Sequence, residues 1–206
     1  MRQKLCIKSV MRQVFLLSPA RVDGRRAATL LSSKASFALA VRLRETGAPI
    51  GEVFSFLSGL YFRGKLAYVE RFAHDTLIIT TNRGLVRPDL TITPDDVRAF
   101  GEVDIGVGDD RFRRPLERDA IALRDAAGPE TRVVLLGSIA TGKYSDTLLD
   151  IFGKNLVFPQ EFVGRGDMSR GGLMLRAARD GQELEYISVD GAIRHGKRPP
   201  KLVPIR

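Results

Sequence analysis

The sequence predicts an α/β protein with a doubly wound, largely parallel sheet and helices on both faces. Short apolar runs alternate along the chain with longer segments of helical spacing. Polar segments, most of them containing glycine, follow several of the apolar runs. The carboxyl ends of parallel strands carry such segments, and ligands of these sheets bind there.

The first predicted strand is Val14–Leu17, an uninterrupted apolar run. The loop Ser18–Gly24 follows it and leads into an Ala/Leu-rich helix from about Arg25. A second apolar run, Val53–Leu57, predicts another strand, and the segment 61–72 after it has the spacing of a helix.

Thr76–Thr80 predicts the next strand because β-branched residues favour strands, and the turn-rich Thr81–Gly84 follows it. Helices are expected from Thr93-Pro94, where proline occupies the first helical position, and over Pro115–Ala127. Arg132–Leu136 is the clearest buried strand. The loop Gly137–Gly142 leads from it into a helix over residues 144–152.

The carboxy-terminal part predicts a short strand at Leu156–Phe158. Leu173–Ala178 and Leu184–Val189 flank an Asp-Gly turn signal, which predicts an antiparallel pair. A basic, proline-containing tail begins at Arg194.

The length of 206 residues and the hydrophobic content of 44% predict one sizeable core, so residues 11–206 are expected to form a single α/β domain with a basic C-terminal tail. Residues 11–13 repeat the opening tripeptide Met-Arg-Gln. We therefore expect residues 1–10 to be a flexible N-terminal extension that precedes the natural start.

The chain is strongly basic, with 33 Lys+Arg against 24 Asp+Glu and a net charge of +9. This balance favours a polyanionic partner, although it also serves solubility alone. The single cysteine, Cys6, and the lack of Cys/His zinc spacing favour a reducing cytoplasm and no metal. No apolar run is long enough for a membrane span, and we expect no cofactor.

Gly137–Lys143 has the phosphate-loop spacing G-x-x-x-x-G-K at a strand-to-helix junction. Tyr144 stands where a serine or threonine would bind magnesium. The motif therefore favours a loop that holds some phosphate, with Lys143 as ligand, over a nucleotide triphosphatase.

Gly164–Gly172 contains four glycines, Arg165, Arg170 and the single carboxylate of Asp167. Glycines allow close approach of a ligand, arginines bind phosphate, and Asp167 could serve as a general base or stabilise a cationic transition state. The alternative is a surface turn in which Asp167 pairs with Arg165 or Arg170.

Other polar side chains follow the predicted strands and are expected at the same rim. Asp23 is the rival catalytic carboxylate, or a cap for the helix near Arg25. Tyr61 could stack on a base or fill the core. The expected base-pocket residues are Ser18, Tyr61, Asn82 and Ser138. The expected nucleic-acid-binding residues are Arg21, Arg63, Lys65, Arg83, Lys143, Arg165, Arg170, Arg194, His195 and Lys197.

The segments Leu60–Ala73, Leu77–Thr80 and Asn82–Asp89 resemble a pattern in an uncharacterised bacterial family that is similar to the glycosylase-like domain of archaeosine synthase. The resemblance covers roughly residues 14–160 in element order. It implies a uracil-DNA-glycosylase-like α/β fold with a base pocket at the strand ends. The Gly-Gln-Asp-Pro-Tyr-His run of uracil glycosylases is absent, which argues against uracil as the substrate.

These observations lead to one expected function and two alternatives. We expect a metal-independent DNA glycosylase that excises a modified base; an antiviral enzyme acting on phage DNA would suit the same scaffold and charge. The first alternative is a non-catalytic nucleic-acid-binding module, and the second is a nucleotide hydrolase.

Overall fold

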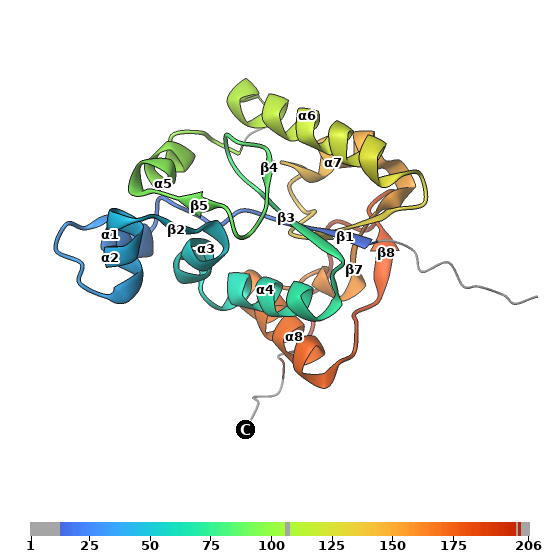
Figure 1. Ribbon diagram of the computed structural model, residues 1–206. Coiled ribbons are helices and arrows are strands. Elements are labelled where there is room, and N and C mark those ends of the chain that lie inside the picture. The colour runs from blue at the N-terminus through green and yellow to red at the C-terminus, as the bar shows by residue number, and fades with distance from the viewer. Residues whose placement is uncertain (1–12, 106–107, 201, 203–206) are drawn as a thin grey trace, which may run out of the picture.

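The computed structural model describes residues 13–105, 108–200 and 202 (Figure 1). Its centre is a six-stranded sheet in the order β4-β3-β1-β6-β7-β8. These strands are β1 (Gln13–Leu17), β3 (Asp75–Ile79), β4 (Leu85–Val86), β6 (Arg132–Leu136), β7 (Leu156–Pro159) and β8 (Tyr186–Ser188). The expected extension at 1–10 lies outside the described residues.

The four central strands, β3, β1, β6 and β7, are parallel, and the edge strands β4 and β8 are antiparallel to their neighbours. The predicted largely parallel sheet is therefore confirmed. Two short strands, β2 (Ala48–Pro49) and β5 (Thr91–Ile92), form a separate antiparallel pair.

The described residues contain eight α-helices. They are α1 (Arg25–Leu31), α2 (Ala38–Glu45), α3 (Ile50–Ser58), α4 (Leu60–Phe72), α5 (Pro94–Gly101), α6 (Asp110–Ala127), α7 (Ser145–Phe152) and α8 (Asp167–Asp180). Helices α6 and α7 lie on one face of the sheet, while α4 and α8 lie side by side on the other (Figure 1). None of these helices combines the length and apolar character that a membrane crossing needs.

The central strands are apolar on both faces because helices cover both. Phe15, Leu16 and Leu17 of β1 are fully buried, as are Leu135 and Leu136 of β6. Burial on both sides is typical of parallel strands and explains why these runs do not alternate with polar residues.

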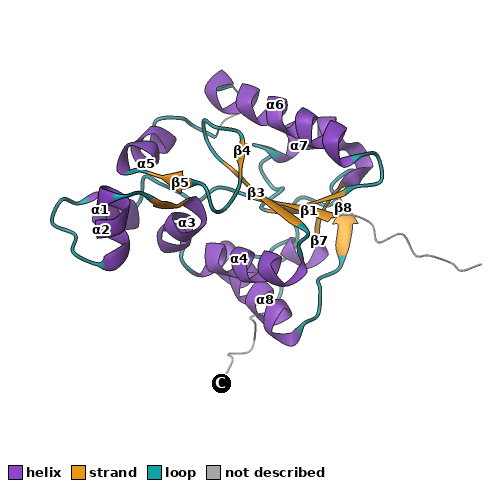
Figure 2. Ribbon diagram, in the orientation of Figure 1, coloured by secondary structure: helices purple, strands orange, loops and turns teal. Residues whose placement is uncertain are grey.

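Two predicted strands are helices in the structure (Figure 2). Val53–Leu57 lies inside α3, whose buried residues Ile50, Val53, Phe54 and Leu57 follow helical spacing. Leu173–Ala178 lies inside α8, where the buried residues Leu173, Met174 and Ala177 also follow helical spacing. The predicted antiparallel pair is therefore wrong, and β8 pairs instead with β7.

The glycine-rich segment Gly164–Gly172 is not one surface turn. Its second part is the first turns of α8, which begins at Asp167. A Cβ on Gly171 would lie 2.6 Å from the Leu60 carbonyl oxygen, and one on Gly64 would lie 2.5 Å from the Gly171 carbonyl oxygen. The glycines therefore allow the backbones of α4 and α8 to touch, which fixes the two helices against each other.

The strand order reverses between β1 and β6. The chain passes from β1 to β3 on one side of β1, and β6 lies on the other side. Such a reversal leaves a crevice beyond the carboxyl ends of the two strands, where α/β proteins bind their ligands.

Candidate functional site

The loops after β1 and β6 meet at the reversal of strand order. Ser18 directly follows β1, and its backbone N–H donates to the Leu136 carbonyl at 3.2 Å. Gly137 and Ser138 directly follow β6. A Cβ on Gly137 would lie 2.9 Å from the Ser18 Cβ and 2.7 Å from the Tyr144 hydroxyl. Only glycine at this position leaves room for both side chains.

Lys65 on α4 is fully buried beside this junction. Its Nζ donates to the Ser18 carbonyl at 2.8 Å and to the Ser18 Oγ at 2.7 Å. The Nζ also lies 4.1 Å from the centre of the Tyr61 ring, within the range of a cation–π contact. Burial lowers the pKa of Lys65 to about 7, with the nearby Asp167 charge opposing this effect.

Tyr144 precedes α7, and its buried hydroxyl lies between the two loops. It accepts the Ser138 backbone N–H at 2.9 Å, and the Ser18 side chain lies near it across Gly137. Burial is the main cause that raises the pKa of Tyr144, so the phenol is neutral at physiological pH.

Tyr61 on α4 is 5% exposed, and no hydrogen bond with the described residues satisfies its hydroxyl oxygen. Burial raises the pKa of this phenol well above its ordinary value. A buried polar atom without a partner is costly, and such atoms in native proteins commonly face a ligand or an ordered water.

Asp167 and Arg170 reach the same place from the first turn of α8. The Asp167 side chain is 67% exposed and pairs with the Arg170 Nη1 at 3.4 Å, so the predicted alternative of an Asp167–Arg170 pair is confirmed. Arg170 is buried, and two of its nitrogens donate to the Phe162 carbonyl at 3.2 and 3.1 Å. The arginine is therefore held by the backbone, while the carboxylate stays accessible.

These groups surround a cavity of about 200 Å³, which we name the β1–β6 cavity. Its lining residues come from five separate segments: Ser18, Pro19, Arg21, Ser58, Tyr61, Ile105, Ser138, Lys143, Tyr144 and Asp167. Sites for drug-sized ligands are typically about 300–1,000 Å³, so this cavity suits a single small ring better than a whole nucleotide.

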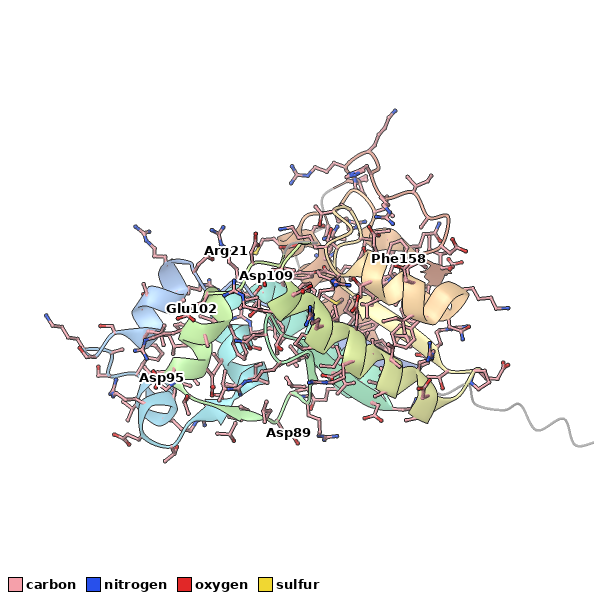
Figure 3. The ribbon with its side chains drawn as sticks, turned by 90° about the horizontal axis from the view of Figure 1, so that it is seen from above. Arg21, Asp89, Asp95, Glu102, Asp109 and Phe158 are labelled. Carbon is pink, nitrogen blue, oxygen red and sulfur yellow. The ribbon has the colours of Figure 1, made fainter. Side chains whose placement is uncertain are left out.

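A second cavity of about 540 Å³ adjoins the first, because Arg21, Ile105 and Lys143 line both. Its remaining wall includes Asp23 and Glu102 (Arg21 and Glu102 are labelled in Figure 3). The Arg21 Nε donates to the Asp23 carboxylate at 2.5 Å, and this bond is the main cause that lowers the Asp23 pKa. Asp23 makes no capping bond to α1, whose N-cap is Gly24.

The structure brings together several of the residues that the sequence singled out. Those that line the β1–β6 cavity are Ser18, Arg21, Tyr61, Ser138, Lys143 and Asp167. Lys65 and Arg170 lie behind this lining, where both are buried. Neither presents a free cation to a phosphate in solvent.

The other predicted ligands lie apart from this cavity. Arg83 pairs with Asp96 and stacks on Phe100, and Asn82 keeps a buried side-chain oxygen without a hydrogen bond among the described residues. Arg63 is exposed on α4. Arg165 donates to the Glu161 carbonyl at 2.9 Å.

The tail residues likewise lie outside the cavity lining. Arg194 pairs with Asp146 at 2.6 Å, whereas His195 and Lys197 are exposed. The tail packs on the loop before α8, since a Cβ on Gly164 would clash with the Lys197 carbonyl.

The phosphate-loop motif forms the expected loop between β6 and α7, but the hydrogen bond of its Ser138 amide is made to another residue of the protein. The Ser138 amide, which would face a phosphate, is bonded to the Tyr144 hydroxyl. Lys143 is exposed on the shared rim of the two cavities. Among the described residues, no group of three or more His, Cys, Asp or Glu could hold a metal ion.

Sequence reasoning missed the role of Tyr144, which it noted only as a departure from the magnesium-binding position. It also treated Lys65 as a surface cation. The second error was avoidable, since Lys65 shares the helical stripe of Tyr61, Tyr68 and Val69, all of which are buried. Pro19, Ser58 and Ile105 carried no signal in the sequence that links them to a cavity.

No protein-family model, curated protein or solved structure matches this chain.

Proposed function

We propose that this protein is a metal-independent N-glycosidase that hydrolyses the bond between a modified base and its sugar in DNA. One observation carries the proposal: a largely exposed carboxylate, Asp167, lines a ring-sized cavity at the reversal of strand order. Enzymes that act on a base turn the nucleotide out of the stack and hold the base in such a pocket.

The proposed reaction requires few catalytic groups. The glycosidic bond breaks through an oxocarbenium-like sugar, which a nearby carboxylate stabilises while it orients the attacking water. In our proposal Asp167 takes this role, because it lines the cavity and is accessible. Asp23 is the weaker candidate, since it lines only the adjoining cavity and is held by Arg21 through two hydrogen bonds, whereas Asp167 has one long bond from Arg170.

The cations at the rim support a polyanionic substrate. The exposed Lys143 lines both cavities, so a phosphate next to the flipped nucleotide would meet it first. Arg21 also lines both cavities, but its charge is paired with Asp23. The acidic residues Glu102 and Asp104, which line the second cavity and not the first, would repel a phosphate. We therefore propose that the DNA backbone contacts the shared rim rather than the depth of the second cavity.

The resemblance to the glycosylase-like domain of archaeosine synthase makes phage DNA with modified bases the first substrate to test. The protein is incubated with a panel of modified DNAs, and abasic sites are then cleaved with alkali. We expect strand cuts together with free base detected by mass spectrometry. Intact DNA and no free base across the panel would contradict the proposal.

The binding-module alternative shares the cations of the rim but needs no carboxylate. It predicts that Asp167→Asn keeps the biological activity, whereas Lys143→Ala removes it. Our proposal predicts the loss of activity in Asp167→Asn with DNA affinity retained. The nucleotide-hydrolase alternative has less support, because the amide of Ser138 is already occupied by Tyr144.

A further inference from the structure

Three neighbouring side chains lie in and behind the cavity wall. Lys65 Nζ bonds to the Ser18 Oγ at 2.7 Å. The Ser18 side chain and the Tyr144 hydroxyl are neighbours, since a Cβ on Gly137 would lie 2.9 Å from the Ser18 Cβ and 2.7 Å from the Tyr144 hydroxyl. Ser18 and Tyr144 line the β1–β6 cavity, whereas Lys65 is sealed behind them. We infer that Lys65, Ser18 and Tyr144 form a proton relay that ends in the cavity and protonates the departing base.

This inference rests on the proposed function, and it adds the acid partner that the carboxylate alone does not supply. A base leaves more readily as a neutral molecule, so protonating one of its acceptor atoms assists cleavage. Asp167 stands on the sugar side of this scheme and the relay on the base side.

Counting donors shows what the relay offers to a ligand. The Lys65 ammonium has three N–H donors, of which two go to Ser18 and the third faces the Tyr61 ring. The Ser138 amide donates to Tyr144. The two hydroxyls of Ser18 and Tyr144 carry two protons, and in the relay the Ser18 hydroxyl donates its proton to Tyr144. The remaining proton points to the cavity, which therefore presents a donor while Lys65 is charged.

When Lys65 loses a proton, the group that faces the cavity changes from a hydrogen-bond donor to an acceptor. The neutral amine can accept the Ser18 hydroxyl proton, Ser18 can accept that of Tyr144, and the cavity then faces an oxygen lone pair. The deep burial of Lys65 makes this loss accessible, because the pKa falls to about 7. The charged and titratable groups that face Lys65 are Asp167 and Arg170 from α8, with Tyr61 on its own helix and Tyr144 before α7.

The reaction balances without an additional reactant. The C1′–N bond breaks and its electron pair goes to the base, which takes a proton from the Tyr144 hydroxyl. Ser18 reprotonates Tyr144, and Lys65 reprotonates Ser18 and is left neutral. The oxygen of water bonds to C1′, and its surplus proton passes to Asp167 and then to solvent. After the base has left, one proton from solvent returns through Tyr144 and Ser18 to Lys65, which restores the ammonium. The relay also implies that the recognised base presents an acceptor atom to the cavity wall.

The pH dependence of base release tests the relay. Release by the wild-type protein is expected to fall about tenfold per pH unit above pH ~7, because Lys65 is then neutral. Tyr144→Phe is expected to release base roughly 100-fold more slowly and to lose this alkaline fall. Lys65→Met is expected to lose the fall as well, which a purely structural role would not produce.

Tyr68→Phe is the matched control. Tyr68 lies on α4, and its hydroxyl bonds to Tyr186 and Leu184 away from the cavity. We expect this variant to release base within about twofold of the wild-type rate and to keep the pH profile. A wild-type rate in Tyr144→Phe, or an unchanged alkaline fall, would overturn the relay while leaving the glycosidase proposal standing.

A second measurement does not depend on activity. NMR titration of the lysine side-chain nitrogens is expected to show one lysine, absent from Lys65→Met, with a midpoint near pH 7. Tyr144→Phe should lower this midpoint by at least ~0.5 pH unit, because Ser18 becomes a poorer acceptor for the ammonium, and Tyr68→Phe should not. A Lys65 midpoint near 10, or one indifferent to Tyr144→Phe, would refute the relay. Failure of base release with a normal titration would instead reject the glycosidase proposal.

Discussion

Burial of the Lys65 ammonium in the candidate site has a large cost in free energy. Its ammonium is fully buried, and two bonds to Ser18 together with two aromatic rings replace its hydration. A pKa lowered from 10.5 to about 7 corresponds to roughly 4–5 kcal/mol of disfavoured charge. A cost of this size at the ligand end of the sheet is typical of groups retained for function.

This cost predicts a specific dependence of stability on pH. Between about pH 7 and 10 the unfolded protein holds the Lys65 proton and the folded protein does not, so the free energy of unfolding rises with pH. The wild type should gain up to about 1.4 kcal/mol per pH unit relative to Lys65→Met in this range, and nothing below it. Urea unfolding at a series of pH values measures the difference.

The exposed Lys154 provides the control for this experiment. The difference between wild type and Lys154→Met should not vary over the same range. Parallel stability curves for the wild type and Lys65→Met would show that Lys65 keeps its proton in the folded protein, and the lowered pKa of this lysine would then be wrong.

Most elements that surround the site were predictable from the sequence. Apolar runs predict β1, β6 and β7, since burial on both faces leaves a continuous signal, and β-branched residues predict β3. The helical spacing of residues 61–72 predicts α4. α3 was mistaken for a strand because Val53–Leu57 is short, apolar and rich in strand-forming residues. The contact of α4 with α8 could not be read from either segment alone, because it depends on glycines more than 100 residues apart.

That contact sets the geometry of the site, because Lys65 lies next to Gly64, and Asp167 and Arg170 precede Gly171. Gly171→Ala would place a Cβ 2.6 Å from the Leu60 carbonyl oxygen. We expect it to lower the free energy of unfolding by about 1–3 kcal/mol, the usual cost of overpacking. Chemical denaturation measures this directly.

Gly172→Ala is the natural control, on the same helix and one residue away. Its Cβ would meet only a leucine methyl, Leu202 Cδ1, at 3.5 Å. The higher helix propensity of alanine should leave this variant equal to the wild type or more stable by up to ~1 kcal/mol. Equal losses in both variants would mean that the close contact of α4 and α8 is not what Gly171 provides.

Across the whole molecule, fewer positive side chains are available to a ligand than the net charge suggests. Many arginines are paired with carboxylates: Arg21, Arg42, Arg83, Arg87, Arg98, Arg111, Arg113, Arg114, Arg118, Arg124, Arg170, Arg179 and Arg194. The composition predicted a basic protein correctly but could not show which cations were left to meet a ligand. Lys143 stands out because it lines both cavities and is exposed.

Lys143→Ala should therefore weaken DNA binding with a recognisable signature. Removing one phosphate contact reduces the slope of log affinity against log salt by about 1. Lys154 lies in the turn that precedes β7, and so at the opposite end of the sheet, and Lys154→Ala should leave the slope unchanged. Fluorescence anisotropy at several salt concentrations checks both. The same slope change in both variants would indicate binding to net charge rather than to the rim.

The central claim is that Asp167, which lines the β1–β6 cavity, promotes hydrolysis of a glycosidic bond. The most direct test is the single-turnover rate of base release by Asp167→Asn compared with Asp180→Asn, which removes a carboxylate at the far end of the same helix. We predict a loss of roughly 100-fold or more for Asp167→Asn and a wild-type rate for Asp180→Asn. Base release by Asp167→Asn at the wild-type rate would contradict the claim.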